Sequence, residues 1–227
     1  MRIKMLIKGD MAFQLKYGFY FVYAIFTLFY VLLLLVIPKE IRNQIGIILI
    51  YTDPAAIGLF FMGAIVLLEK SQNILNSIAV SPVKVSEYIL SKLISLGLIA
   101  AIVAGIISLL CGIGTPILVM FSTFFGSFLF SMIGLMVAAK TNSLNQFIIM
   151  TVPFELICFV PPMLYMFLYK HKLMLLHPGC AIIHLLNKEQ GFEILPVIIL
   201  FLWILIIYKL TEIIVRRMFL SVGGGKL

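Results

Sequence analysis

The chain has 227 residues, of which 63% are hydrophobic and only 11% charged, and its mean hydropathy is +1.19. Soluble domains carry about twice that share of charged residues, so the composition excludes a soluble globular protein. The net charge of +8 is not concentrated in a polar, domain-length segment. It therefore argues against a nucleic acid partner and favours contact with anionic lipid headgroups.

Long apolar runs predict helices that cross a membrane. A helix needs about 20 apolar residues to span the bilayer, whereas a barrel strand needs about 10 of alternating polarity. The runs in this chain are long and unbroken, so we expect an all-α integral membrane protein with a single transmembrane domain over residues 1–227. The six predicted spans lie at about 18–37, 44–68, 94–113, 117–139, 147–168 and 194–208.

The distribution of Lys and Arg predicts the orientation of these spans. The first run is longer than the apolar part of a signal peptide and no small-residue cleavage site follows it, so we expect it to be retained. With the N-terminus inside, most basic residues fall in cytoplasmic segments, among them Arg2, Lys70, Lys140 and Arg217. Both termini are then expected in the cytoplasm by the positive-inside rule.

The segment LLEKSQNILNSIAVSPVKVSEYILSKL, residues 67–93, interrupts the apolar pattern between the second and third spans. From Lys70 to Val80, apolar residues recur at helical spacing, which predicts a short amphipathic helix. Ser81-Pro82 ends it, because the residue before a proline disfavours the helical conformation, and a second helix leads into the third span. The residues alone leave two roles open, a helix resting on the headgroups or a docking element.

This segment also carries a resemblance to a known family. Its pattern is similar to the E-[KR], SP, EY and K signature of membrane-spanning subunits in the ABC-2-type exporter family, which have a type V membrane domain. The chain most resembles the small permease branch for fluoroquinolone export, around residues 52–56, 58–61 and 67–70. The residues that match the signature are Glu69, Lys70, Ser81, Pro82, Glu87, Tyr88 and Lys92.

The resemblance implies how the chain is driven. In that family the helix before the Ser-Pro pair is a coupling helix, which rests in a groove of a separate ATP-binding subunit. Glu69 and Lys70 would fix the elbow where the second span leaves the membrane, and Ser81-Pro82 would end the helix. The residues that would contact the ATPase are Gln72, Asn73, Leu75, Asn76, Ile78 and Ala79.

The chain lacks the pattern of an ATPase. A phosphate-binding loop requires Gly-x-x-x-x-Gly-Lys followed by Ser or Thr, and the similar stretch at 223–226 is followed by Leu227. ATP and Mg²⁺ are therefore expected on the partner subunit, and this chain is predicted to bind no cofactor and to be a permease rather than an enzyme. The few Cys and His residues lack metal-ligand spacing, so no metal site is expected.

Small residues recur at every fourth position in the third and fourth spans. Gly97, Ala101 and Gly105 form one row, and Gly134 and Ala138 belong to another. Such rows let helix backbones approach closely in lipid, so they mark helix interfaces within one subunit or between two. Because a half-transporter needs a partner to enclose a pathway, we expect a second permease chain, either an identical copy or a close paralogue.

Two acidic residues lie inside apolar runs, where a charge costs about 2.5–3.5 kcal/mol. Asp53 precedes Pro54, a pattern that starts helices, so capping and substrate or proton binding both stay open. Glu155 is followed by helix-bending prolines and either lines a pathway or pairs with a neighbour. The resemblance makes the second and fifth spans pathway walls. The predicted pathway residues are Asp53, Phe60, Phe61, Glu155, Pro161 and Pro162.

Residues 169–193 form the longest predicted outer segment. Its apolar middle, residues 181–186, is too short to span the membrane and is predicted to dip back as a re-entrant helical segment before the sixth span.

Together these features predict the permease subunit of an ATP-driven ABC exporter in the bacterial cytoplasmic membrane. It would move a hydrophobic or amphiphilic compound, such as a drug, an antibiotic or a lipid-like molecule, out of the cytoplasm or inner leaflet by alternating access. The alternative is a non-transporting membrane protein, an immunity or assembly factor, with no ATPase partner.

Overall fold

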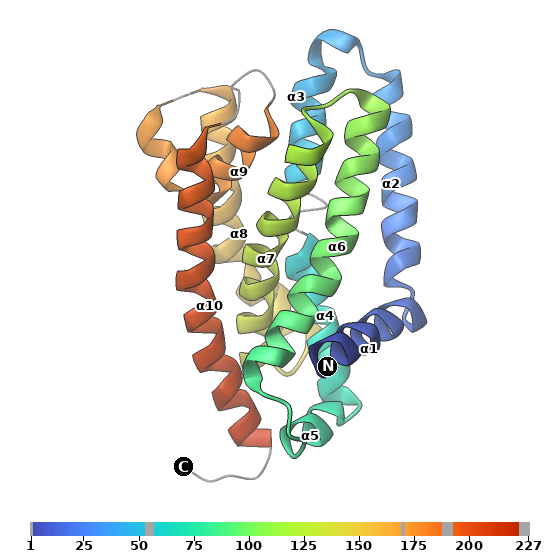
Figure 1. The fold of residues 1–227 in the computed structure, drawn as a ribbon, viewed down its shortest axis with the longest axis vertical. Helices are drawn as coiled ribbons and strands as arrows, with labels where there is room; N and C mark the ends of the chain where they lie inside the picture. The colour runs from blue at the N-terminus through green and yellow to red at the C-terminus, as the bar shows by residue number, and fades with distance from the viewer. Residues whose placement is uncertain (1, 53–56, 169–170, 188–192, 223–227) are drawn as a thin grey trace.

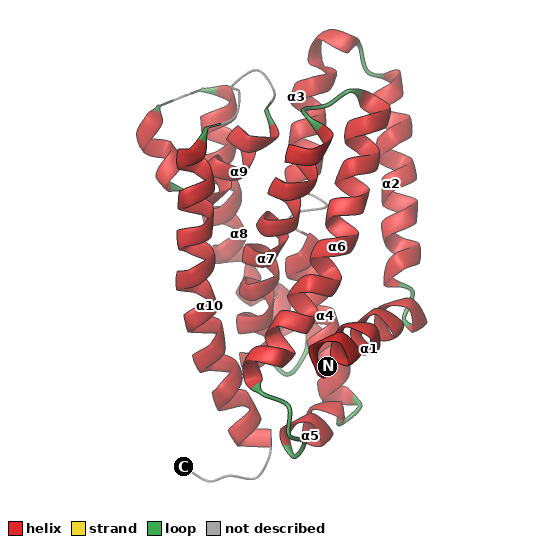
Figure 2. Cartoon of the chain, viewed as in Figure 1, coloured by secondary structure: helices red, strands yellow, loops and turns green. Residues whose placement is uncertain are grey.

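The structure is a computed structural model that describes residues 2–52, 57–168, 171–187 and 193–222. Within these ranges it consists of helices joined by short turns, with no strand (Figure 2). In chain order the helices are α1 (Arg2–Lys16), α2 (Phe19–Val36), α3 (Lys39–Ile50), α4 (Ile57–Ser71), α5 (Ile74–Ala79), α6 (Val85–Cys111), α7 (Pro116–Lys140), α8 (Leu144–Phe167), the 3-10 helix η2 (Lys172–Leu176), α9 (Pro178–Leu186) and α10 (Ile194–Val222).

Five helices in the described part of the chain are long and apolar enough to cross a membrane. They are α2, α6, α7, α8 and α10, which correspond to the first, third, fourth, fifth and sixth predicted spans. They run along the long axis of the molecule (Figure 1). The apolar windows of α6 and α7 are 67% buried, against 17% for α8. The all-helical membrane class is thus confirmed, with α6 and α7 inside and α8 facing outward.

The second predicted span, 44–68, covers two described helices, α3 and α4. α3 ends at Ile50, Tyr51 and Thr52 form a π-helical turn, and α4 begins at Ile57. With 12 and 15 residues, neither reaches the length of about 20 that a crossing needs. The described part of the predicted span is therefore helical on both sides of residues 53–56, and whether one helix runs through 44–68 depends on residues outside the described ranges. Asp53 itself lies outside the described residues.

Helix α7 is the centre of the bundle, in contact with α4, α6, α8, α9 and α10. Small residues allow its closest approaches. A Cβ atom on Gly134 would lie 2.2 Å from the carbonyl oxygen of Leu59 in α4, and one on Gly97 would lie 2.9 Å from the Phe128 ring. The rows of small residues therefore mark interfaces inside one chain, and they give no indication of a second subunit.

Glycines also shape the turn between α6 and α7. Gly112 and Gly114 have φ angles of 68° and 61°, in the left-handed region that side chains disfavour. A Cβ on Gly114 would lie 2.7 Å from the carbonyl oxygen of Leu186, so this turn packs directly on the end of α9.

Helix α9 coincides with the segment predicted to be re-entrant. It has nine residues, every one from Gly179 to Leu186 is buried, and it packs against α7, α8 and α10. In Figure 1 it lies at the upper end of the bundle, beside the start of α10. A short buried helix at this place confirms the helical part of the prediction.

Helix α10 extends well beyond the predicted end of the sixth span at residue 208. Glu212 forms ion pairs with Lys209 at 3.6 Å and with Arg216 at 3.5 Å, one helical turn away on each side. Such pairs support a polar helical extension, which an apolar window does not detect.

Candidate functional site

Helices α1 and α5 lie at the lower end of the molecule in Figure 1, and a cluster of charged side chains joins α1 to α4 and α6. The ammonium of Lys92 on α6 lies 2.5 Å from a carboxylate oxygen of Glu69 on α4 and 3.0 Å from one of Asp10 on α1. The side chains of Lys92 and Glu69 are 1% and 5% exposed. The Tyr88 hydroxyl donates to the second carboxylate oxygen of Glu69 at 2.8 Å. We call Asp10, Glu69, Tyr88 and Lys92 the elbow cluster.

The elbow cluster holds α1, α4 and α6 in fixed positions relative to one another. A buried charge is tolerated only when it is paired and hydrogen-bonded, so each member requires the others to stay in place. The Lys92 ammonium also lies 4.8 Å from the centre of the Tyr88 ring, within the range of a cation–π contact. Helices α1, α4 and α6 are therefore held together where α4 leads into the turn before α5.

Helix α1 braces the same region from outside. Gln14 donates to the Ser95 hydroxyl at 2.8 Å, Arg2 donates to the Pro82 carbonyl at 3.2 Å, and Gln72 donates to the Tyr17 hydroxyl. These contacts join α1 to α6 and to both turns that flank α5.

The sequence analysis missed α1 and the place of Asp10. The sequence feature that could have predicted α1 is the spacing of the residues that face the bundle. They recur every three or four positions, as in an amphipathic helix. The residues of this face that are partly or fully buried are Ile3, Leu6, Ile7, Asp10 and Gln14.

Lys70 links the elbow to α7. Its ammonium donates to the carbonyl oxygens of Ala138, Ala139 and Thr141 at 2.7, 3.0 and 2.8 Å. The last carbonyls of a helix have no partner within the helix and carry partial negative charge, so a cation there is doubly favourable. Lys70 thereby joins the end of α4 to the end of α7.

Replacing Lys70 with methionine is expected to lower the free energy of unfolding by about 1–3 kcal/mol, because three helix-end carbonyls lose a charged donor. Thermal unfolding of the detergent-solubilised protein measures this loss. Lys140→Met is the matched control, since Lys140 is an exposed lysine at the same helix end. Equal effects of the two substitutions would contradict the capping role of Lys70.

The short amphipathic helix predicted between Lys70 and Val80 is present but shorter than expected. Residues 72 and 73 form a turn, in which Asn73 has a φ of 57°, and α5 covers only Ile74–Ala79. Asn is one of the few residues that adopt this left-handed conformation readily. Ser81 then donates to the Ile78 carbonyl at 2.7 Å, and the turn through Pro82 leads into α6.

The predicted contact residues around α5 differ in exposure. Gln72, Asn73 and Asn76 are exposed, Ile78 and Ala79 are half-buried, and Leu75 is only 1% exposed, inside the protein. Val80, at the end of α5, is 80% exposed. The lower end therefore presents a small polar surface with one prominent apolar side chain.

The predicted pathway residues do not gather at one place. On α4, Phe60 faces Phe147 of α8, with ring centroids 6.5 Å apart, whereas Phe61 packs against Phe19 and Tyr23 of α2 at 5.0 and 4.8 Å. Neighbours on a helix point about 100° apart, so the two rings face different helices. Glu155 is half-buried on α8, and it makes no hydrogen bond or ion pair with any residue that the structure describes.

Pro161 and Pro162 determine how α8 meets its neighbours. A proline has no N–H for the carbonyl four residues before it, so this pair leaves the carbonyls of Ile157 and Cys158 without helical donors. The Tyr51 hydroxyl donates to the Cys158 carbonyl at 2.7 Å. The Ile157 carbonyl interacts with His177, which raises the pKa of that imidazole. Burial has the larger effect, so the pKa of His177 lies below its ordinary value.

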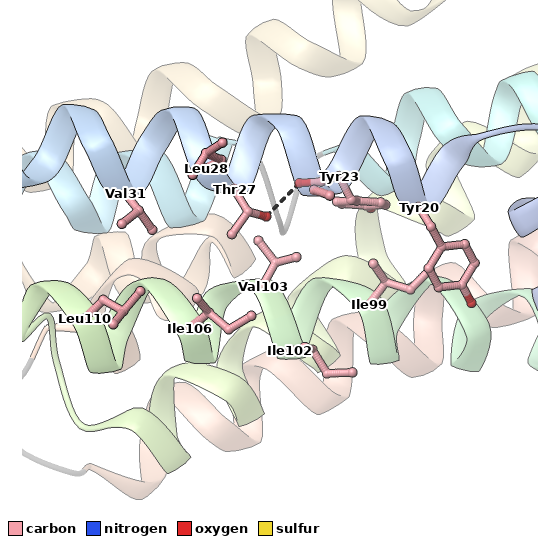
Figure 3. A pocket seen from close by; sticks show the side chains of 11 residues that line it. Tyr20, Tyr23, Thr27, Leu28, Val31, Ile99, Ile102, Val103, Ile106 and Leu110 are labelled. Carbon is pink, nitrogen blue, oxygen red and sulfur yellow. Dashed lines mark hydrogen bonds between the residues drawn. The ribbon is translucent and has the colours of Figure 1, made fainter.

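An apolar groove of about 430 Å³ runs between α2 and α6 (Figure 3). The lining residues Tyr20, Tyr23 and Thr27 of α2 carry hydroxyl groups, and the Thr27 hydroxyl donates to the Tyr23 carbonyl at 2.6 Å. Ligand sites contain a few polar groups that orient the ligand. The side of the groove formed by Ile99, Val103 and Ile106 suits lipid chains instead.

The membrane-length helices define a multi-pass membrane protein. The profile of the fluoroquinolones export permease protein family matches residues 1–220, so the chain belongs to this family of membrane export permeases. This match confirms the resemblance drawn from the segment at 67–93. Neither the curated proteins nor the solved structures contain a match to the chain.

Proposed function

We propose that this permease is the membrane-spanning subunit of an ATP-driven exporter, with a separate ATP-binding subunit docked on α5. The observation that carries the proposal is the elbow cluster. It ties the short helix, through α4 and α6, to the rest of the bundle by buried ionic contacts. A lever must be stiff in this way if it is to convert closure of a partner into movement of membrane helices.

The path of the force follows from the contacts. A displacement of α5 acts on α4 through the turn at Gln72 and on α6 through the turn at Pro82. Lys70 carries the movement of α4 to the end of α7, and Glu69 carries it to Lys92 on α6. Because α1 is bonded to both turns, it moves as part of the same rigid unit.

The docking surface consists of the side chains that α5 and its turns expose. Gln72, Asn73 and Asn76 supply polar contacts, and Val80 supplies an apolar one. Leu75 holds α5 against the protein rather than meeting the partner, because it is buried. ATP and Mg²⁺ are bound by that partner.

The transport pathway in this proposal runs along α4 and α8. α3 and α4 together complete a sixth crossing, with the α5 end and both termini in the cytoplasm of a bacterium. Phe60 and Glu155 face the pathway, Pro161-Pro162 gives α8 its break, and a second permease chain closes the other side. Alternating access would then export hydrophobic or amphiphilic compounds, including the fluoroquinolones for which the family is named.

The substitution Val80→Asp tests the docking surface. Because Val80 is 80% exposed, the change leaves the fold intact but places a charge in the apolar part of the interface. We expect capture of a co-expressed ATP-binding subunit from the neighbouring gene to fall at least about tenfold, as for loss of a central apolar contact. The measurement is the ratio of the two subunits after affinity purification.

Leu173→Asp is the matched control, since Leu173 is an apolar residue outside α5 that is 68% exposed. It should leave the subunit ratio unchanged. If Val80→Asp also leaves the ratio unchanged, the docking surface is misplaced. If the wild-type chain captures no ATPase at all, the alternative of a non-transporting membrane protein gains support.

A further inference from the structure

A cavity of about 260 Å³ lies within one chain, between α7, α8, α9 and α10. Four aromatic rings from different elements line it, those of Tyr51, Phe130, Phe154 and Trp203. The buried helix α9 contributes Gly179 and Ile182 to the wall. The lining is almost entirely apolar and aromatic, which suits a flat, hydrophobic ring system.

The walls of this cavity are held in place before any ligand arrives. Tyr51 is fixed by its hydrogen bond to the Cys158 carbonyl and by edge-to-face packing on Phe130, with centroids 5.7 Å apart. The Trp203 ring donates to the Leu176 carbonyl at 2.9 Å. A site whose side chains are already ordered loses little conformational entropy on binding, so its contacts count toward affinity.

The absence of a side chain at Gly179 allows close packing at the edge of the cavity. A Cβ on Gly179 would lie 2.3 Å from the Tyr51 hydroxyl and 2.5 Å from the Pro162 ring. The start of α9 therefore approaches the break in α8 as closely as backbone contact allows. Pro162, Tyr51 and the start of α9 therefore pack against one another at the edge of the cavity.

A carboxylate stands next to this aromatic lining. Glu155 directly follows the cavity-lining Phe154 on α8 and lies one helical turn before Cys158, which also lines the cavity. It is half-buried, and none of the described residues pairs with it. An ionisable group without a partner is expensive to keep in a membrane-spanning helix, so the Glu155 carboxylate is available to pair with a cationic ligand.

We propose that this cavity binds an aromatic amphiphile that carries a basic amine, with the ring system among Tyr51, Phe154 and Trp203 and the ammonium at Glu155. The aromatic part of the site lies inside one subunit, and the site shares Glu155 with the pathway proposed along α4 and α8. The proposal rests on the proposed function in one respect, that the exported compound binds to this chain.

Trp203 provides a direct test, since it is the single tryptophan in the sequence. Purified permease in detergent is titrated with norfloxacin, which carries a basic amine, and with nalidixic acid, which has a similar ring system without that amine. Trp203 fluorescence, corrected for absorption with free N-acetyltryptophanamide, is expected to show saturable quenching. Glu155→Gln should weaken norfloxacin binding at least about tenfold and leave nalidixic acid binding unchanged, because only the amine loses a charged partner.

Phe154→Ala should weaken the binding of both compounds about three- to tenfold, by removing one ring from the wall. The matched control is Phe167→Ala on the same helix, which removes an exposed ring outside the cavity. Quenching that does not saturate, or that Phe154→Ala leaves unaltered, would overturn the site and leave the cavity to lipid chains. The titration contains no ATPase, so its failure is distinct from a failure of subunit capture.

Discussion

Replacing Lys92 with methionine is expected to lower the free energy of unfolding by about 3–5 kcal/mol, as when one partner of a buried ion pair is removed. Methionine keeps the length of the side chain but leaves Glu69 and Asp10 without their shared cation. The two carboxylates then face each other in a buried site, and α1, α4 and α6 lose their common joint. Coupling to a partner ATPase should be lost together with stability.

A thiol-reactive dye measures this loss, because Cys111 and Cys180 are buried and become accessible only on unfolding. The midpoint should fall by roughly 6–20 °C, at about 2–4 °C per kcal/mol for a chain of this size. Lys8→Met serves as control, since Lys8 is exposed on α1. An equal midpoint for Lys92→Met and the control would show that the elbow cluster does not hold the fold.

A second substitution separates charge from packing in the elbow cluster. Glu69→Gln in the Lys92→Met background removes one of the uncompensated carboxylates, so part of the lost stability should return. If the double variant is instead less stable by the sum of the two single losses, the two residues act independently. Their 2.5 Å contact makes coupling the expected result.

The helices and turns of this fold can be predicted from the sequence, but the contacts between residues far apart in the chain cannot. Hydropathy identifies five membrane-length helices because burial in lipid imposes a minimum apolar length. The helix at α5 and the break at Pro82 follow from periodicity and backbone sterics. Lys92 belongs to a visible motif, but its pairing with Asp10 crosses 82 positions of the chain, and no local pattern encodes it.

The predicted pathway residues also could be identified from the sequence, whereas their orientation in the bundle could not. The identity of Phe60 and Phe61 is plain from the sequence, but which of them faces α8 depends on how α4 is rotated against α7. The close contact of Gly134 with Leu59 sets that rotation. Similarly, an apolar run at 44–68 does not reveal that α3 passes into a π-helical turn at Tyr51 and Thr52. Tertiary packing, rather than composition, decides both points.

Gly134→Ala is therefore expected to disturb the molecule more than its single methyl group suggests. The new Cβ would lie 2.2 Å from the Leu59 carbonyl oxygen and 2.9 Å from its carbon, which are backbone atoms of α4 and cannot rotate away. α4 must move off α7, at a cost of about 3 kcal/mol, the upper end of the range for overpacked cores. The contacts of Lys70 with the end of α7 weaken at the same time, so transport should fall with stability.

For the matched control, Gly9→Ala, we expect a change of opposite sign in the free energy of unfolding. No atom lies within 4 Å of a Cβ at Gly9, which is exposed on α1, so alanine should stabilise that helix by about 0.5–1 kcal/mol. Both variants are compared by the dye assay in the same detergent. A midpoint for Gly134→Ala at or above the wild-type value would mean that α4 and α7 are free to separate. In that case α4 could not transmit the displacement of α5 to the centre of the bundle.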